Sequence, residues 1–202
     1  TDRKKSEDKE DMRERIIYHE LGHFINSYVF YMEKYNNDIK LVEEKIPFLK
    51  ISSEAISKHN ALGYVLSDNE SDDLETKSSL EQDVIALYGG LASESFFYGK
   101  ENVSTGSYND LEKASKILNN MVNNLGMYSK FKLNLNFIDG SELKEENLKE
   151  LKKISDDLYN KSIYNVEINK ELIEELKNIL TEKWVLDKHE IFTYIKEYLD
   201  RI

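Results

Sequence analysis

MRERIIYHELGHFINSYVFYME, residues 12–33, is the stretch that decides the central element of the fold. Its apolar residues recur at spacings of four, three and four, at Ile17, Leu21, Phe24 and Tyr28. That spacing is typical of an amphipathic α-helix with one apolar stripe facing a core. We therefore expect a helix over residues 9–33.

Two histidines stand four residues apart in this predicted helix, in the order His19-Glu20-Leu21-Gly22-His23. Residues at this spacing share one helix face, so the two imidazoles can bind one tetrahedral metal ion. Glu20 lies beside them, where its carboxylate can take a proton from a bound water rather than bind the metal. Gly22 is expected to leave room beside the metal. The pattern predicts zinc-dependent hydrolysis with one zinc ion per chain.

The composition limits the kind of site and partner. The 202 residues are 40% hydrophobic and 11% aromatic, which suits one globular domain with a substantial core. A formal net charge of -11 does not favour binding to nucleic acid. Cysteine is absent, so a zinc site must use histidine and carboxylate. No apolar run approaches the ~20 residues of a membrane span, so we expect neither a membrane-spanning helix nor a signal peptide in these residues.

The third metal ligand cannot be chosen from the histidine motif alone. A metzincin would carry glycine and histidine three and six residues after the second histidine, where this chain has Asn26 and Val29. A thermolysin-like site would take a glutamate about twenty residues downstream, and Glu43 and Glu44 occur there without the accompanying signature. The two remaining histidines, His59 and His189, are interpreted as ordinary surface residues.

Further helices follow from the scarcity of breaking residues, one proline and eight glycines in the chain. We expect helices over residues 78–98 and from about 109 to 125, and two or three more in the remainder. The pair Gly89-Gly90 inside the first of these predicts close packing against another backbone. Two capping boxes are predicted, Asn109 with Glu112 and Asp187 with Glu190. The less regular residues 41–66 are interpreted as a small β-sheet.

Several short segments occur in an order that is typical of one protein family. They are Tyr18–His23 (YHELGH), Ala61–Val65 (ALGYV), Leu87–Gly90 (LYGG, followed by Ala92 and Glu94), Val103–Asp110 (VSTGSYND), Met121-Val122, Leu125–Met127, and Leu186-Asp187 with Glu190-Ile191. Together they resemble the peptidase domain of the FtsH-type ATP-dependent zinc metalloproteases. Residues 130–180 match only loosely, Leu91 replaces the family's arginine, and Ser95 stands where a second glutamate is usual.

The resemblance implies the missing site residues. It places the third zinc ligand at Asp110, whose carboxylate would also suit a helix N-terminus. It also implies that extended substrate adds as a strand along Gly63, Tyr64, Val65 and Leu66. The fold expected is mainly α (α+β), with a small β-sheet beside the active-site helix. We predict one metallopeptidase domain over 1–202, with a polar lead-in (1–11), a catalytic core (12–130) and a helical C-terminal part (131–202).

The function that the resemblance implies is zinc-dependent endoproteolysis of unfolded or extracted polypeptides, in protein quality control. The chain has no GxxxxGK[ST] phosphate loop, so it is not expected to be the motor. Residues 2–6 (DRKKS) resemble the stretch that follows the family's ATPase module, so we expect an AAA-type ATPase module to precede Thr1 in a longer protein. That protein is expected to form a homohexamer and to be membrane-anchored, with this soluble part on the cytoplasmic or organelle-matrix side. The alternative is a catalytically idle scaffold or regulatory domain of the same fold that binds polypeptides without an ATPase partner.

Overall fold

The computed structural model describes residues 2–53, 64–66, 74–128, 132–139 and 141–202, with backbone alone for residues 2–8, 64–66 and 141. The elements in these ranges are mostly helices, which confirms a mainly α fold with a small sheet. In chain order they are α1 (Asp2–Lys34), α2 (Ile39–Lys45), β1 (Lys50–Ser52), β2 (Tyr64–Leu66), α3 (Lys77–Tyr98), α4 (Tyr108–Asn123), α5 (Ser141–Ile168), α6 (Lys170–Lys183), β3 (Val185–Asp187) and α7 (Lys188–Leu199), with short 3-10 turns at Lys100–Asn102, Thr105–Ser107 and Leu135–Phe137.

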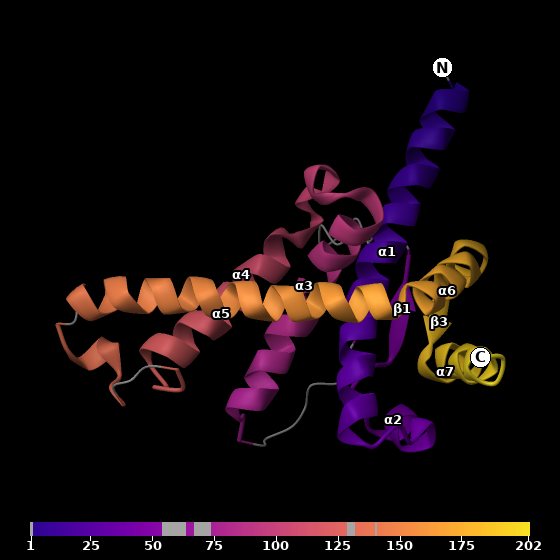
Figure 1. Cartoon of the computed structure of the whole chain (residues 1–202). Coiled ribbons are helices and arrows are strands. Elements are labelled where there is room, and N and C mark those ends of the chain that lie inside the picture. The colour runs from indigo at the N-terminus through magenta and orange to yellow at the C-terminus, as the bar shows by residue number, and fades with distance from the viewer. Residues whose placement is uncertain (1, 54–63, 67–73, 129–131, 140) are drawn as a thin grey trace.

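Helix α1 runs through the middle of the molecule (Figure 1). It packs most extensively on α3 on one side and contacts α6 on the other, while the long helix α5 crosses α3, α4 and α1. The first turns of α1 project beyond the other elements (Figure 1). No helix in the described ranges is both long and apolar enough to cross a bilayer.

The predicted apolar stripe of α1 lies in the larger of two hydrophobic clusters. Ile17, Leu21, Phe24 and Tyr28 are all buried there, against side chains of α2, β1, α6 and α7. Burying each such side chain contributes about 1.5–3 kcal/mol. The second cluster joins α3, α4 and α5 and includes Val84, Leu118 and Leu158. Helices α1 and α3 both have buried apolar residues and pack directly on each other.

The sheet has the strand order β2-β1-β3, with both pairings antiparallel. Ile51 at the centre of β1 lies opposite Val65 on one side and Leu186 on the other. The sheet expected beside the active-site helix is present, and both β1 and β2 contact α1. Strand β3 was not expected, because its three residues between two helices carry no alternating pattern and are recognised only through their pairing with β1.

Three local predictions were wrong. Residues 2–8, expected to precede the helix as part of a polar lead-in, belong to α1, since the lysine, arginine and glutamate among them are good helix formers. Part of the expected sheet region forms α2, because the Asp38 carboxylate caps it by accepting from the backbone N–H of Lys40 and Leu41. Helix α4 begins at Tyr108 with Ser107 as its N-cap, so the predicted Asn109 cap does not form.

Other local predictions are confirmed. Helix α3 begins one residue before the predicted start and ends before Gly99, as expected. Asp187 and Glu190 form the predicted capping box of α7. The division into a catalytic core and a C-terminal part at residue 130 stays a prediction.

Candidate metal centre

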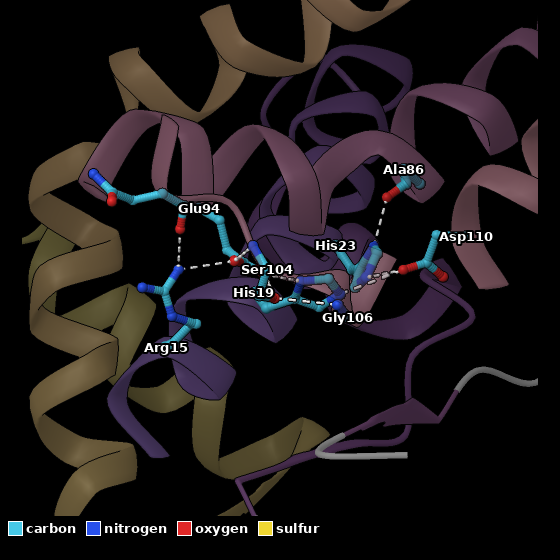
Figure 2. A network of polar contacts seen from close by, with 9 residues as sticks. Arg15, His19, His23, Ala86, Glu94, Ser104, Gly106 and Asp110 are labelled. Carbon is cyan, nitrogen blue, oxygen red and sulfur yellow. Dashed lines mark hydrogen bonds and ion pairs between the residues drawn. The ribbon is translucent and has the colours of Figure 1, made fainter. Parts of the chain in front are cut away.

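Three of the predicted site residues meet at one point between α1 and α4 (Figure 2). The Nε2 atoms of His19 and His23 each lie 3.3 Å from the same oxygen, Oδ2 of Asp110. The two imidazole rings are 4.8 Å apart between centroids. One potential ligand atom from each of the three residues lies within 4.8 Å of the others, so this group can hold a metal ion. Two nitrogens and one carboxylate oxygen are a donor set that zinc accepts, with a fourth position left for water or substrate.

Both histidine rings are oriented by hydrogen bonds on their other nitrogen. His23 Nδ1 lies 2.8 Å from the carbonyl oxygen of Ala86 on α3, and a carbonyl can only accept, so Nδ1 carries the proton. His19 Nδ1 lies 2.8 Å from Oε1 of Glu94 and donates to that carboxylate. These bonds turn Nε2 of both rings toward Asp110. Oriented histidines of this kind are characteristic of metal ligands.

Glu94 has a larger part in the site than its sequence context indicates. Its side chain is 1% exposed, and it accepts four hydrogen bonds: Oε1 from His19 and the Ser104 hydroxyl, Oε2 from Arg15 and the Ser104 backbone N–H. Burial raises the pKa of Glu94, but the bonds from His19 and Ser104 outweigh it and lower the pKa to about 2. Glu94 is therefore a carboxylate throughout the physiological range.

The electrostatics of the site favour a cation. Burial lowers the pKa of His19, but the carboxylates of Asp110 and Glu94 raise it by more, to about 9. Burial raises the pKa of Asp110, and the bonds to both histidines reverse this and hold that pKa well below its usual range. Without a metal, a protonated imidazole thus supplies the positive charge between two carboxylates. A divalent ion at the same point would supply it instead.

Glycines allow the helices that carry the site to approach closely, as predicted for Gly89-Gly90. A Cβ added at Gly22 would lie 2.1 Å from the carbonyl oxygen of Gly89, so the two backbones touch. This contact corrects the expectation for Gly22, which faces α3 rather than leaving room beside the metal. A Cβ at Gly90 would lie 2.4 Å from Nε2 of His19. Gly90 therefore makes the space that the His19 ring occupies.

The remaining predicted residues fall in different places. Glu20 follows His19 on α1 and is buried, at 8% exposure. Tyr64, Val65 and Leu66 form β2, whereas Gly63 and the surface candidate His59 lie outside the described residues.

The rival third ligands make ion pairs elsewhere. Glu43 pairs with Lys196 and His189 on α7, and Glu44 pairs with Lys45. The His189 side chain is exposed, in agreement with its interpretation as a surface residue. Neither glutamate belongs to the group of potential ligands around the histidine pair in the described part of the chain.

Sequence reasoning from spacing could not find the contacts of Glu94 or Ala86. Glu94 is 75 residues from His19, and Ala86 is 63 residues from His23. Their contribution depends on the packing of α3 against α1. The one available signal for Glu94 was its place in the segment that resembles a known family, which does not assign it a partner.

The chain is similar to known proteins over most of its length. A family model described as peptidase family M41 matches residues 7–193. The proteins named ATP-dependent zinc metalloprotease FtsH from Buchnera aphidicola subsp. Acyrthosiphon pisum and from Mesomycoplasma conjunctivae are 35% and 36% identical over 119 residues, 58% of this chain. That from Malacoplasma penetrans is 38% identical over 117 residues, 57% of this chain.

These alignments cover 17%, 14% and 12% of the three relatives, so the chain spans only a small part of their length. The family match, by contrast, extends over nearly the whole chain and includes α1, α3 and α4, the helices that carry the candidate site. It confirms the resemblance to the FtsH-type peptidase domain. The chain therefore belongs to peptidase family M41.

Proposed function

We propose that this chain is a zinc-dependent endopeptidase domain, with His19, His23 and Asp110 as the protein ligands of one zinc ion. The observation that carries the proposal is the convergence of both histidine Nε2 atoms on one carboxylate oxygen, 3.3 Å from each. The residues fit zinc: the ligand atoms are nitrogen and oxygen, and each imidazole donates its other N–H to a fixed acceptor. Zinc, when bound, supplies a Lewis acid that activates water and polarises a peptide carbonyl.

The chain's own residues supply the rest of the reaction. Glu20, next to His19 on α1, takes the proton of the attacking water on its carboxylate and delivers it to the departing amine. Glu94 and the Ala86 carbonyl keep the imidazoles in one tautomer and orientation during turnover. His19, His23 and Asp110 act as ligands and take no proton from substrate. This assigns one role to each residue.

Strand β2 is the proposed place for substrate. It pairs with β1 along one edge, and in the described ranges no strand pairs with its other edge. An extended polypeptide can add at this edge by backbone hydrogen bonds, and these bonds do not depend on the side chains of the polypeptide. Because β2 also contacts α1, a strand added to it would run near the helix that carries His19 and Glu20. Unfolded polypeptides are the substrates that can adopt this conformation.

The link to an ATP-driven motor is also a proposal, supported by the name of the relatives, ATP-dependent zinc metalloprotease FtsH. We propose that an ATPase module delivers extracted polypeptide to this domain and that the complete protein is a membrane-anchored hexamer. The encoded sequence upstream of Thr1 tests the first part, because an ATPase module would carry the GxxxxGK[ST] motif.

The enzymatic proposal is tested on the purified chain, with zinc content and hydrolysis of casein as an unfolded substrate. We expect close to one zinc per chain and measurable hydrolysis in the wild type. Glu20→Gln should retain zinc and lose about 100-fold or more in rate, since it removes the general base. His23→Ala should lose most of the zinc. Near-normal hydrolysis by Glu20→Gln would refute the assigned mechanism, and zinc-loaded wild type without hydrolysis would favour the idle scaffold.

A further inference from the structure

Arg15 is the cation in contact with the buried carboxylate of Glu94. It stands four residues before His19, so Arg15, His19 and His23 form one row along a single face of α1. Its Nη1 lies 3.1 Å from Oε2 of Glu94. Its guanidinium also lies over the ring of Tyr98, 4.2 Å from the centroid. The two contacts restrict the side chain to one orientation, although 28% of it is exposed.

The same nitrogen of Arg15 also holds the connection that leads to Asp110. Nη1 donates to the backbone carbonyl of Asn102 at 2.6 Å. Two residues later, Ser104 donates its backbone N–H and its hydroxyl to the two oxygens of Glu94, each at 2.8 Å. The segment between α3 and α4 is thus attached to α1 through Arg15 and Glu94. Figure 2 shows Arg15, Glu94, Ser104 and His19 in one continuous network.

Arg15 is one of four hydrogen-bond donors to the buried Glu94 carboxylate. A carboxylate offers about four lone-pair sites, and here all four are used. Arg15 is the donor among them that carries a permanent charge. Without it, one lone pair of a buried carboxylate loses its partner and the charge is compensated only by neutral donors and His19. Glu94 would then lose its fixed position, and with it the acceptor that orients the His19 ring.

We infer that Arg15 is a positioning residue for the metal centre: through Glu94 it orients His19, and through Asn102 it fixes the segment that presents Asp110. Its side-chain contacts are with Glu94, Asn102 and Tyr98, not with the three proposed ligands. This inference rests on the proposed function, because it concerns the affinity of the proposed zinc site. Outer partners of metal ligands typically contribute about 10–100-fold to affinity, and Arg15 acts one bond further out.

The chain offers a matched control in Arg13, two residues away on the same helix. Its guanidinium lies 3.5 Å from the centroid of the Trp184 ring. It donates to the carbonyl oxygens of Leu180 and Thr181. Arg13 also donates to the Ser53 hydroxyl. It thus makes an aromatic contact and backbone contacts of the same kinds as Arg15, but its contacts do not include the metal centre.

The experiment compares Arg15→Gln with Arg13→Gln in the full chain. Zinc affinity is measured by competition with a chromophoric chelator, the visible absorption of the Co²⁺ form reports ligand geometry, and urea unfolding of the metal-free chains reports stability. We expect Arg15→Gln to weaken zinc about tenfold and to change the Co²⁺ spectrum. Arg13→Gln should change zinc affinity by less than about twofold even where it lowers stability, because it is outside the network.

Two more variants separate the loss of the charge of Arg15 from a failure of the chain to fold. Arg15→Met keeps the apolar contact with Tyr98 and should reproduce the zinc loss if Arg15→Gln does not fold. Arg15→Lys keeps the positive charge and should recover zinc affinity to within about threefold of wild type. Wild-type zinc affinity in Arg15→Gln or Arg15→Met, or an equal loss in Arg13→Gln, would overturn the inference alone. Failure of the wild type itself to bind zinc would overturn the proposed function and this inference together.

Discussion

Replacing Gly90 by alanine separates the stability of the fold from the integrity of the metal centre. The added Cβ would lie 2.4 Å from Cε1 and from Nε2 of His19, and ordinary contact begins at 3.4 Å. The His19 ring must therefore move by about 1.0 Å relative to α3 to restore ordinary contact. The ring is not free to give way, because it is buried and bonded to Glu94 on α3 at 2.8 Å.

The magnitudes differ for stability and for metal binding. In the metal-free chain, alanine gains about 1 kcal/mol over glycine within a helix, and overpacking costs about 1–3 kcal/mol. The expected net destabilisation is thus at most about 2 kcal/mol. Ligand distances in metal sites tolerate only about 0.2 Å, so a displacement of 1.0 Å removes His19 as a ligand. We expect zinc affinity to fall by at least about 100-fold.

The assay is chelator competition for zinc together with urea unfolding of the metal-free chain. Gly106→Ala is the control, because its added Cβ would lie at an ordinary contact distance of 3.8 Å from His19 Cε1. Its tightest contact, 3.1 Å, is with the Ser104 hydroxyl and not with His19. It should leave zinc affinity within about threefold of wild type. Zinc affinity in Gly90→Ala equal to that in Gly106→Ala would refute the reasoning, because His19 would then have another position from which to bind.

Three further predictions concern carboxylates. Asp110→Asn removes the ionised oxygen that faces His19 and His23, and we expect zinc binding to be nearly lost in calorimetric titration; unchanged binding would exclude Asp110 as a ligand. Glu94→Gln keeps the side-chain volume but not the charge, and should lower zinc affinity by about 10–100-fold. A loss of rate at unchanged zinc affinity would argue against a role of Glu94 in orienting His19 for zinc binding. Burial raises the pKa of Glu43, but the bonds from Lys196 and His189 lower it by more, so this group stabilises the fold above its ordinary pKa and the effect is lost as pH falls through the lowered value. Glu43→Gln should therefore lower the free energy of unfolding by at most about 1 kcal/mol at pH 7, lose this difference from wild type as pH falls through the lowered pKa, and leave zinc affinity unchanged; reduced zinc affinity would return Glu43 to the metal centre.

The sequence by itself determined those features that depend on neighbours a few residues apart. His19 and His23 share a face of α1 because an α-helix has 3.6 residues per turn. The buried stripe of Ile17, Leu21 and Phe24 follows from the same period. The cap formed by Asp187 and Glu190 and the end of α3 before Gly99 are equally local. Such features were predicted correctly because their geometry requires no knowledge of packing.

The tertiary structure alone decided what surrounds the two histidines. Asp110 is 91 residues from His19 and Glu94 is 75, and spacing carries no information on distances across such separations. The family resemblance indicated Asp110. The network of Arg15, Glu94 and Ser104 depends on the close packing of α1 against α3 at Gly22 and Gly89, and only the structure shows it. Strand β3 likewise forms because β1 offers a free edge to Leu186, not because its three residues prefer an extended chain. Contacts of this kind arise because the burial of apolar faces brings polar groups from distant parts of the chain together. Once buried, these polar groups form hydrogen bonds with one another.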